Sequence, residues 1–187
     1  TEPTKVGSTF AGWFTDATAG TEVTTATDVK ITSAQTLYAH WTTKASKSIT
    51  KGEMTGGSVT ISSDESGSSV ITEAVEGSTV YLTPAADTGY TYTSGTLAAK
   101  YTDDDGEKQS ITLTETSEDS GVFKFTMVNY DVTVSAEFAP NTYTVRFNAN
   151  GGSGEMKDQE FTYDVEAKLS KNTFTNGTDV FAGWATE

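Results

Sequence analysis

The sequence has no cysteine, one histidine and three prolines, and it is short of positive charge. Lys and Arg number 12 against 26 Asp and Glu, which gives a formal net charge of −14. Without cysteine, a disulfide framework, thiol catalysis and Cys-ligated zinc or iron–sulfur sites are excluded. His40 alone cannot build a multi-histidine metal site. Because basic residues supply most nucleic-acid affinity, we expect no nucleic-acid partner. We also expect no cofactor.

Long apolar runs are also missing, so we expect no membrane insertion in this stretch of chain. Nothing at residue 1 is typical of a signal peptide, and any targeting segment would lie outside the sequence. The acidic residues are scattered, which favours solubility over a dedicated acidic binding face. Nine Phe, eight Tyr and three Trp argue for a folded chain, because they stand in alternating patterns that bury well.

Alternation of apolar and polar residues with period two dominates the sequence. It is clearest at 36–41, 132–138 and 143–148, and it predicts half-buried strands. Residues 34–35 and 164–169 could hold one turn of helix at most. Shorter alternating pairs and triplets occur at Val59/Ile61, Val80/Leu82, Ile111/Leu113 and Phe123/Phe125/Met127. The chain is therefore predicted to be mainly β, with little helix, and Gly- or Asn-containing turns every ten to twenty residues or so favour several small antiparallel sheets.

A short sequence is repeated near the two ends of the chain. The tetrapeptide Phe-Ala-Gly-Trp stands at 10–13 and again at 181–184. Large aromatic residues in small β domains are usually core residues, so we expect a structural role for them in preference to a ligand platform. The expected structural anchors are Phe10, Trp13, Trp41, Phe138, Phe147, Phe181 and Trp184.

These residues carry a family resemblance. Residues 7–41, from the first Phe-Ala-Gly-Trp to Thr-Leu-Tyr-Ala-His-Trp at 36–41, resemble the second half of an internalin B-repeat, also called the Listeria–Bacteroides repeat. Residues 142–187 resemble the first half of such a repeat, with Tyr-Thr-Val-Arg-Phe-Asn-Ala-Asn-Gly-Gly at 143–152. The chain has Asn-Gly-Thr-Asp at 176–179, where the family usually has a basic or Pro-Gly-Tyr turn.

The middle of the chain resembles a divergent B-repeat module. Its opening strand is Gly-Gly-Ser-Val-Thr-Ile-Ser at 56–62, its second lies at 75–84, and its closing strand is Asp-Val-Thr-Val-Ser-Ala-Glu-Phe at 131–138. The family commonly has Pro directly after the Met that precedes this closing strand. In this chain that Met is Met127, and it is followed by Val128. The predicted organisation is therefore a B-repeat-like C-terminal half at 1–45, a divergent module at 46–140 and an N-terminal half at 141–187.

The resemblance implies small β-grasp-like modules of extracellular, often wall-attached bacterial proteins, with no catalytic activity. We expect a secreted or cell-surface stalk, spacer or protein-interaction module. Alternatives are an adhesin for a host receptor or glycan and an accessory module of a secreted hydrolase. The two terminal halves would pair within one chain, pair head to tail between molecules, or leave exposed sheet edges.

Candidate sites are few. Asp103, Asp105 and Glu107 are weak calcium candidates, because the loop does not fit an EF-hand register and is better interpreted as an acidic hairpin turn. His40 is expected to be a surface or edge histidine without a catalytic partner. Tyr90, Tyr92 and Tyr101 are the candidate ligand-binding aromatics, since sugar rings stack on such faces. The alternative for these tyrosines is cross-strand packing over a small core.

Overall fold

The structure is a computed structural model that describes residues 2–27 and 33–185. Within these ranges every regular element is a β-strand, so the prediction of a mainly β fold with several small sheets is confirmed. No helix long and apolar enough to span a membrane occurs in the described part of the chain. We refer to residues 2–45, 46–140 and 141–185 as the N-terminal, middle and C-terminal segments.

The N-terminal segment forms a three-stranded antiparallel sheet. Its order is β2 (Glu22–Val23), β1 (Ser8–Phe14) and β3 (Tyr38–Thr43). A bulge between Phe10 and Gly12 shifts the β1–β3 register by one residue, so that Phe10 lies opposite Trp41 and Gly12 opposite His40. In the C-terminal segment β15 (Thr142–Val145) pairs with β16 (Gln159–Thr162).

The middle segment contains the two largest sheets. The five-stranded sheet has the order β10 (Lys108–Ile111), β9 (Ala98–Thr102), β13 (Val132–Ser135), β4 (Ser46–Lys51) and β6 (Glu73–Val75). The four-stranded sheet has the order β11 (Thr114–Glu115), β12 (Phe123–Thr126), β7 (Thr79–Ala86) and β5 (Gly57–Ser62). A short pair, β8 (Tyr90–Tyr92) with β14 (Phe138–Pro140), extends toward the C-terminal segment.

One strand pair departs from the antiparallel pattern expected from the sequence. β4 and β13 run parallel, with Ile49 opposite Val132 and Lys51 opposite Val134. Asp131 fixes the start of this pair, because its Oδ1 accepts the backbone N–H of Ser48 at 2.8 Å. Parallel strands need a long connection, and here the stretch from β5 to β12 supplies it.

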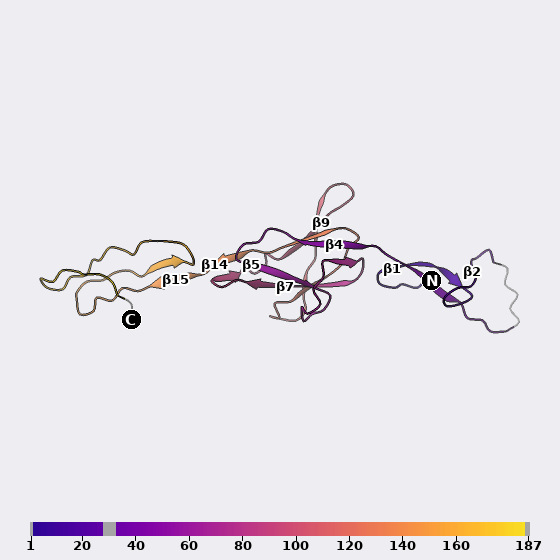
Figure 1. The fold of residues 1–187 in the computed structure, drawn as a ribbon, viewed down its shortest axis with the longest axis horizontal. Helices are drawn as coiled ribbons and strands as arrows, with labels where there is room; N and C mark the ends of the chain where they lie inside the picture. Colours follow the sequence, from indigo (N-terminus) through magenta and orange to yellow (C-terminus); the bar gives the residue numbers. More distant parts are fainter. Residues whose placement is uncertain (1, 28–32, 186–187) are drawn as a thin grey trace.

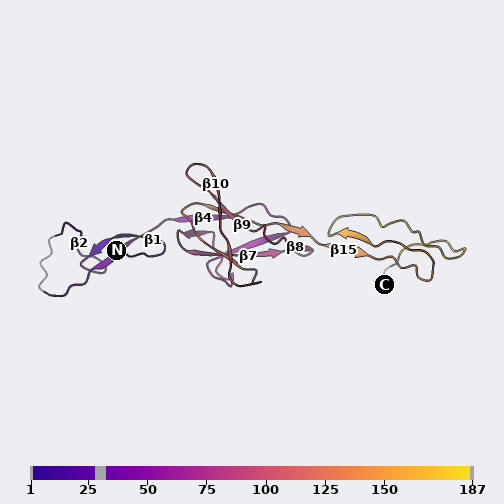
Figure 2. The ribbon, with the colours of Figure 1, turned by 180° about the vertical axis from the view of Figure 1, so that it is seen from behind.

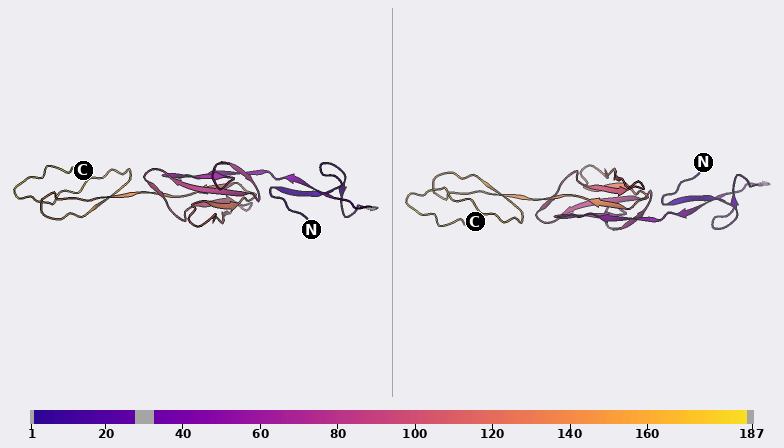
Figure 3. Two further views of the ribbon diagram at one scale, coloured as in Figure 1. Left: turned by 90° about the horizontal axis from the view of Figure 1, so that it is seen from below. Right: turned by 90° about the horizontal axis from the view of Figure 1, so that it is seen from above.

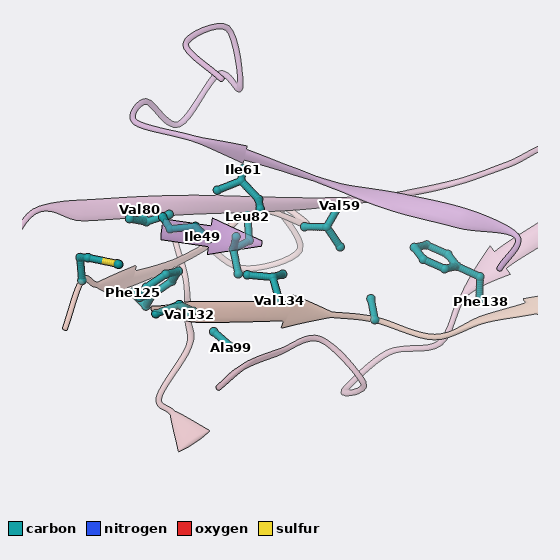
Figure 4. Close-up of a cluster of buried hydrophobic side chains, with 12 residues drawn as sticks. Ile49, Val59, Ile61, Val80, Leu82, Ala99, Phe125, Val132, Val134 and Phe138 are labelled. Atoms are coloured by element: carbon teal, nitrogen blue, oxygen red, sulfur yellow. The ribbon is translucent and has the colours of Figure 1, made fainter. Parts of the chain in front are cut away.

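The hydrophobic core lies between the two large sheets (Figure 4). Alternating residues of β5 and β7 meet those of β4, β9 and β13, which accounts for the period-two pattern in the sequence. All buried hydrophobic residues of the described chain belong to the middle segment: Ile49, Val59, Ile61, Val80, Leu82, Ala99, Phe125, Met127, Val132, Val134, Ala136 and Phe138. The terminal segments therefore have no fully buried hydrophobic side chain among their described residues.

The three segments lie in a row, with the terminal segments at opposite ends (Figures 1 and 2). The same linear arrangement is seen from below and above (Figure 3). Only residues 44–45 separate β3 from β4, and only Asn141 separates β14 from β15. The pairing of the two terminal segments within one chain, which the sequence left open, is absent from this arrangement, because β3 pairs with β1 and β15 with β16.

Candidate functional site

Three aromatic rings organise the N-terminal sheet. The ring centroid of Phe10 lies 5.4 Å from that of Trp13 and 5.7 Å from that of Trp41, both edge to face. β1 and β3 bring the rings together because Phe10 and Trp41 are directly opposite each other. All three rings are only half-buried. The cluster therefore covers one face of a thin sheet, and it is not enclosed by a second layer.

His40 lies on the same strand as Trp41 and has purely structural contacts. Its ring stacks on Phe14 with the centroids 3.9 Å apart, and its Nε2 lies 2.9 Å from the backbone oxygen of Asp16. The N–H groups of Thr18 and Ala19 donate to Asp16 and hold the pKa of this carboxyl below its usual value. His40 thus fixes the turn that follows β1.

A second aromatic cluster lies in the C-terminal segment. The ring centroid of Trp184 lies 4.7 Å from that of Phe147, 4.8 Å from that of Phe181 and 6.1 Å from that of Phe174. Residues 181–184 form no strand, although their sequence is identical to that of residues 10–13. Phe181 is 48% exposed, so it does not occupy the core position expected of it. The reason is that no strand equivalent to β3 lies beside this copy of the tetrapeptide in the described chain.

The glycines of the two tetrapeptides have similar backbones and different surroundings. Gly12 has a φ of 137° and Gly183 a φ of 157°, both outside the range that L-residues favour. A methyl group on Gly12 would lie 2.9 Å from Oε1 of Glu22 in β2, whereas one on Gly183 would meet no atom within 4 Å. The two copies therefore share a positive glycine φ, and the contact that Glu22 makes beside Gly12 has no equivalent at Gly183 among the described residues.

Exposed hydrophobic residues are concentrated in the terminal segments. Of the nine large hydrophobic residues exposed in the described chain, only Val70 lies in the middle segment. The N-terminal segment exposes Val6, Leu37 and Tyr38, and the C-terminal segment exposes Tyr143, Val165, Leu169, Val180 and Phe181. Sequence analysis did not single out most of these residues. Signals were nonetheless present, since Leu37 and Tyr38 lie in the alternating stretch 36–41 and Val180 precedes the repeated tetrapeptide.

The candidate tyrosines of the middle segment are half-buried and engaged in packing. Tyr90 contacts Tyr163 edge to face, with the centroids 5.8 Å apart, and its ring covers Gly56. Tyr92 packs on Phe138, with the centroids 5.9 Å apart. Tyr101 stacks on Tyr130 at 4.9 Å and lies apart from the other two, in β9. This geometry is that of cross-strand packing, and a glycan or receptor surface at these rings stays a prediction.

In the acidic loop at 103–107, the carboxylate of Asp103 accepts hydrogen bonds from the hairpin itself. Oδ1 of Asp103 accepts the N–H groups of Asp105 and Glu107, at 3.2 and 2.8 Å. Oδ2 accepts Nε2 of Gln109 at 2.8 Å, and this bond is the largest cause of the lowered pKa of Asp103. No group of three or more His, Cys, Asp or Glu side chains suited to a metal ion occurs within the described ranges. The weak calcium candidates therefore do not converge, and the loop has the geometry of an acidic hairpin turn.

At each of the two joints, where one segment meets the next, a side chain lies in close contact with a glycine. The first joint involves Gly7 of the N-terminal segment and Val75 of the middle segment. Gly7 has a φ of 69°, and a methyl group on it would lie 2.7 Å from Cγ2 of Val75. The Gly7 oxygen accepts the N–H of Lys44 at 2.9 Å, and Lys44 Nζ contacts Glu76 at 2.6 Å. Side chains of the N-terminal and middle segments thus meet directly at this joint.

The second joint involves Gly89 and Tyr163. The Tyr163 ring packs on Gly89, where a methyl group would lie within 2.4 Å of the ring. Asn141 bonds to both sides, because its N–H donates to the Gly89 oxygen at 2.8 Å and its own oxygen accepts the N–H of Tyr163 at 2.8 Å. Turns at glycines are predictable from the sequence, whereas nothing in the local pattern indicates that Gly89 and Tyr163 meet.

Comparison with known proteins gives one match. The model of the Listeria-Bacteroides repeat domain matches residues 1–40 and 143–187, which contain both Phe-Ala-Gly-Trp copies, and leaves the middle of the chain unmatched. No curated protein and no solved structure matches the chain. The resemblance inferred from the sequence is confirmed for these two stretches, which belong to the Listeria-Bacteroides repeat domain family.

Proposed function

We propose that this chain is a stalk or spacer in a bacterial cell-surface or secreted protein, built from three β modules at 1–45, 46–140 and 141–187. The repeat family is typical of bacterial surface or secreted proteins and is generally non-catalytic. In this proposal the middle module is a divergent B-repeat. Contacts with other proteins would be made by the module faces and strand edges.

The observation that carries the proposal is the linear arrangement of the segments (Figure 1). A spacer must hold its two ends apart. The connections between β3 and β4 and between β14 and β15 are short, and they keep the distance between the ends large. The contacts at Gly7 and Gly89 restrict bending, because a side chain of one segment lies directly on the backbone of the next. A chain with long flexible linkers would not hold its ends apart in this way.

Small-angle X-ray scattering of the dilute chain tests the proposal. A compact domain of 187 residues has a radius of gyration of about 16 Å. The spacer requires a clearly larger value and an elongated distance distribution. A radius close to that of the compact domain would refute it.

The joint at Gly89 offers a sharper test of the same proposal. Gly89→Ala forces the Tyr163 ring off the backbone, so it should broaden the distance distribution while leaving the middle core intact. Gly95→Ala is the matched control, because Gly95 has a similar φ of 81° but no neighbour within 4 Å. Equal broadening in both variants would mean that the Tyr163 contact does not restrain the joint.

A further inference from the structure

The two long strands of the N-terminal segment, β1 and β3, form an antiparallel pair whose open end lies at the first joint. Ser8, the first residue of β1, is opposite Thr43, the last residue of β3. The chain enters the pair at Ser8 and leaves it from Thr43 toward β4, so both connections are at the same end. We call the Ser8–Thr43 pair the mouth of β1 and β3.

Residues 5–7, which lead into β1, are held from two sides. The Gly7 oxygen accepts the backbone N–H of Lys44, which directly follows β3, at 2.9 Å. The side chain of Val75, the last residue of β6, packs against Gly7 from the middle segment. Lys5 Nζ lies 5.9 Å from the centroid of the Trp41 ring, which is a cation–π contact. The entering chain is therefore fixed to β3 and to the middle segment at once.

The end of β3 is anchored separately to the middle segment. Lys44 Nζ lies 2.6 Å from Oε2 of Glu76, and the two side chains are 34% and 39% exposed, so solvent ions screen this ion pair only in part. The backbone of Lys44 thus bonds to Gly7, and its side chain bonds to Glu76. When residues 5–7 are pulled away, β3 stays attached to the middle segment and β1 alone is detached.

Tension along the chain acts on this strand pair in an unfavourable direction. Hydrogen bonds between antiparallel strands are perpendicular to the strands. A pull that enters before Gly7 and leaves through β3 and β4 separates the strands at the mouth, so these bonds break in order from Ser8 toward Phe14. Unfolding of the middle segment instead exposes the core between its two sheets as one cooperative unit. Because forced unfolding is governed by the unfolding rate, β1 and β3 should separate first.

We propose that residues 5–7, together with Trp41, Lys44 and Val75, form a latch that releases the N-terminal segment under tension. Once the latch opens, β1 separates from β3 and residues 8–43 become extended chain, which adds about 120 Å of length. The middle segment stays folded, so the molecule lengthens without losing its core. The use of this device rests on the proposed spacer role, whereas the order of opening is a property of the chain alone.

Stretching single molecules through handles fused to both ends tests the latch. The wild-type chain should lengthen by about 120 Å before the middle segment unfolds. In the double variant Ser8→Cys, Thr43→Cys a disulfide can form across the mouth, because directly opposite residues of antiparallel strands have the Cα separation that such a bond requires. The native chain has no cysteine, so no other disulfide competes. Oxidation should abolish this lengthening and reduction should restore it, while any opening of the C-terminal segment is unaffected.

The double variant Phe14→Cys, Tyr38→Cys is the matched control. This pair lies at the other end of the same two strands, so its disulfide leaves the mouth free. Only residues 8–14 and 38–43 can then separate and extend. The early lengthening should therefore remain and shorten to about 45 Å.

A substitution at Gly7 tests the latch contacts themselves. Gly7→Ala places a methyl group 2.7 Å from Cγ2 of Val75 at a φ of 69°, so the N-terminal segment should open at a lower force than in wild type. Gly95→Ala is the control, because Gly95 has a φ of 81° but no neighbour within 4 Å. It should leave the opening force of the N-terminal segment unchanged.

Three results would overturn the proposal. The first is a middle segment that unfolds before the N-terminal segment or together with it. The second is an early lengthening that is the same with and without the disulfide across the mouth. The third is an equal fall in opening force in Gly7→Ala and Gly95→Ala, which would leave the latch contacts without effect. A compact particle in X-ray scattering would refute the spacer role and would change none of these results, so the two proposals fail separately.

Discussion

Residues 10–13 and 181–184 have the same sequence and differ in structure. The first copy is part of β1, pairs with β3 and packs Phe10 between Trp13 and Trp41. The second forms no strand, although its glycine also has a positive φ and its tryptophan lies near three phenylalanine rings. Local sequence therefore sets the glycine φ and the Phe–Trp contact, while a neighbouring strand decides whether the segment becomes part of a sheet.

The same contrast holds between the middle segment and the two ends. The middle segment buries its alternating residues between two sheets, whereas the terminal sheets have one layer each. Stability should accordingly be concentrated in the middle, because the free energy of unfolding follows buried apolar area.

The largest effect is expected for Leu82→Ala. Leu82 is fully buried between the large sheets, so its truncation should lower the free energy of unfolding by about 2–5 kcal/mol in chemical denaturation. Leu37→Ala is the matched control at an exposed terminal position and should cost less than about 0.5 kcal/mol. Similar losses in the two variants would contradict the concentration of stability in the middle segment.

The next effect separates the two glycines. Gly12→Ala meets both an unfavourable φ and the Glu22 side chain, so it should destabilise the N-terminal sheet by about 1–3 kcal/mol. The measurement is the loss of amide protection in residues 38–43. Gly183→Ala has the φ penalty alone and should leave the protection of residues 142–145 nearly unchanged. An equal loss in both sheets would mean that Glu22 contributes nothing.

Hydrogen exchange of the unmodified chain compares the two copies directly. Amides of residues 10–13 should be protected by pairing with β3, while those of residues 181–184 should exchange within about tenfold of an unfolded peptide in dilute solution. Equal protection of both copies in dilute monomer would contradict the structural difference between them.

The smallest effect is a pH dependence that depends on one long-range hydrogen bond. The N–H of Ser48 lowers the pKa of Asp131 below its ordinary value, so the stabilisation is present above the unfolded pKa and is lost as pH falls through the folded pKa. Asp131→Asn should therefore reduce the fall in Tm between neutral and acidic pH. Asp16→Asn is the comparison variant, because the Asp16 carboxylate accepts hydrogen bonds from its own turn in the N-terminal segment, so its loss should leave the Tm of the middle segment unchanged. An unchanged fall in Asp131→Asn would exclude this contribution.

Sequence patterns predicted where the strands lie better than which strands pair with one another. Alternation located β5, β7, β12 and β13, because each buries one face in the core. It could not show that β4 pairs with β13 in parallel, since that pairing joins residues more than eighty positions apart. The turn at Gly89 was predictable from its residue type, whereas its contact with Tyr163 depends on how two segments meet.

The candidate sites illustrate the same limit of local patterns. Tyr90 and Tyr92 alternate about Thr91 as strand residues do, and this pattern is compatible with both an open face and a covered one. Only the placement of Tyr163 and Phe138 shows that the rings are packed. Conversely, Phe181 looked like a core residue because its counterpart Phe10 has the same neighbours in sequence, and its exposure follows from an absent strand.

The parallel pairing of β4 and β13 has a mechanical consequence. The chain enters the middle segment through β4 and leaves it after β13, so tension between the two ends of the molecule pulls these adjacent strands in opposite directions along their length. Their evenly spaced hydrogen bonds then bear the load together in shear, and they do not open one after another as in a peeled hairpin. Resistance to stretching depends on the barrier to this rupture, so we expect the pair of β4 and β13 to carry the load when the molecule is stretched.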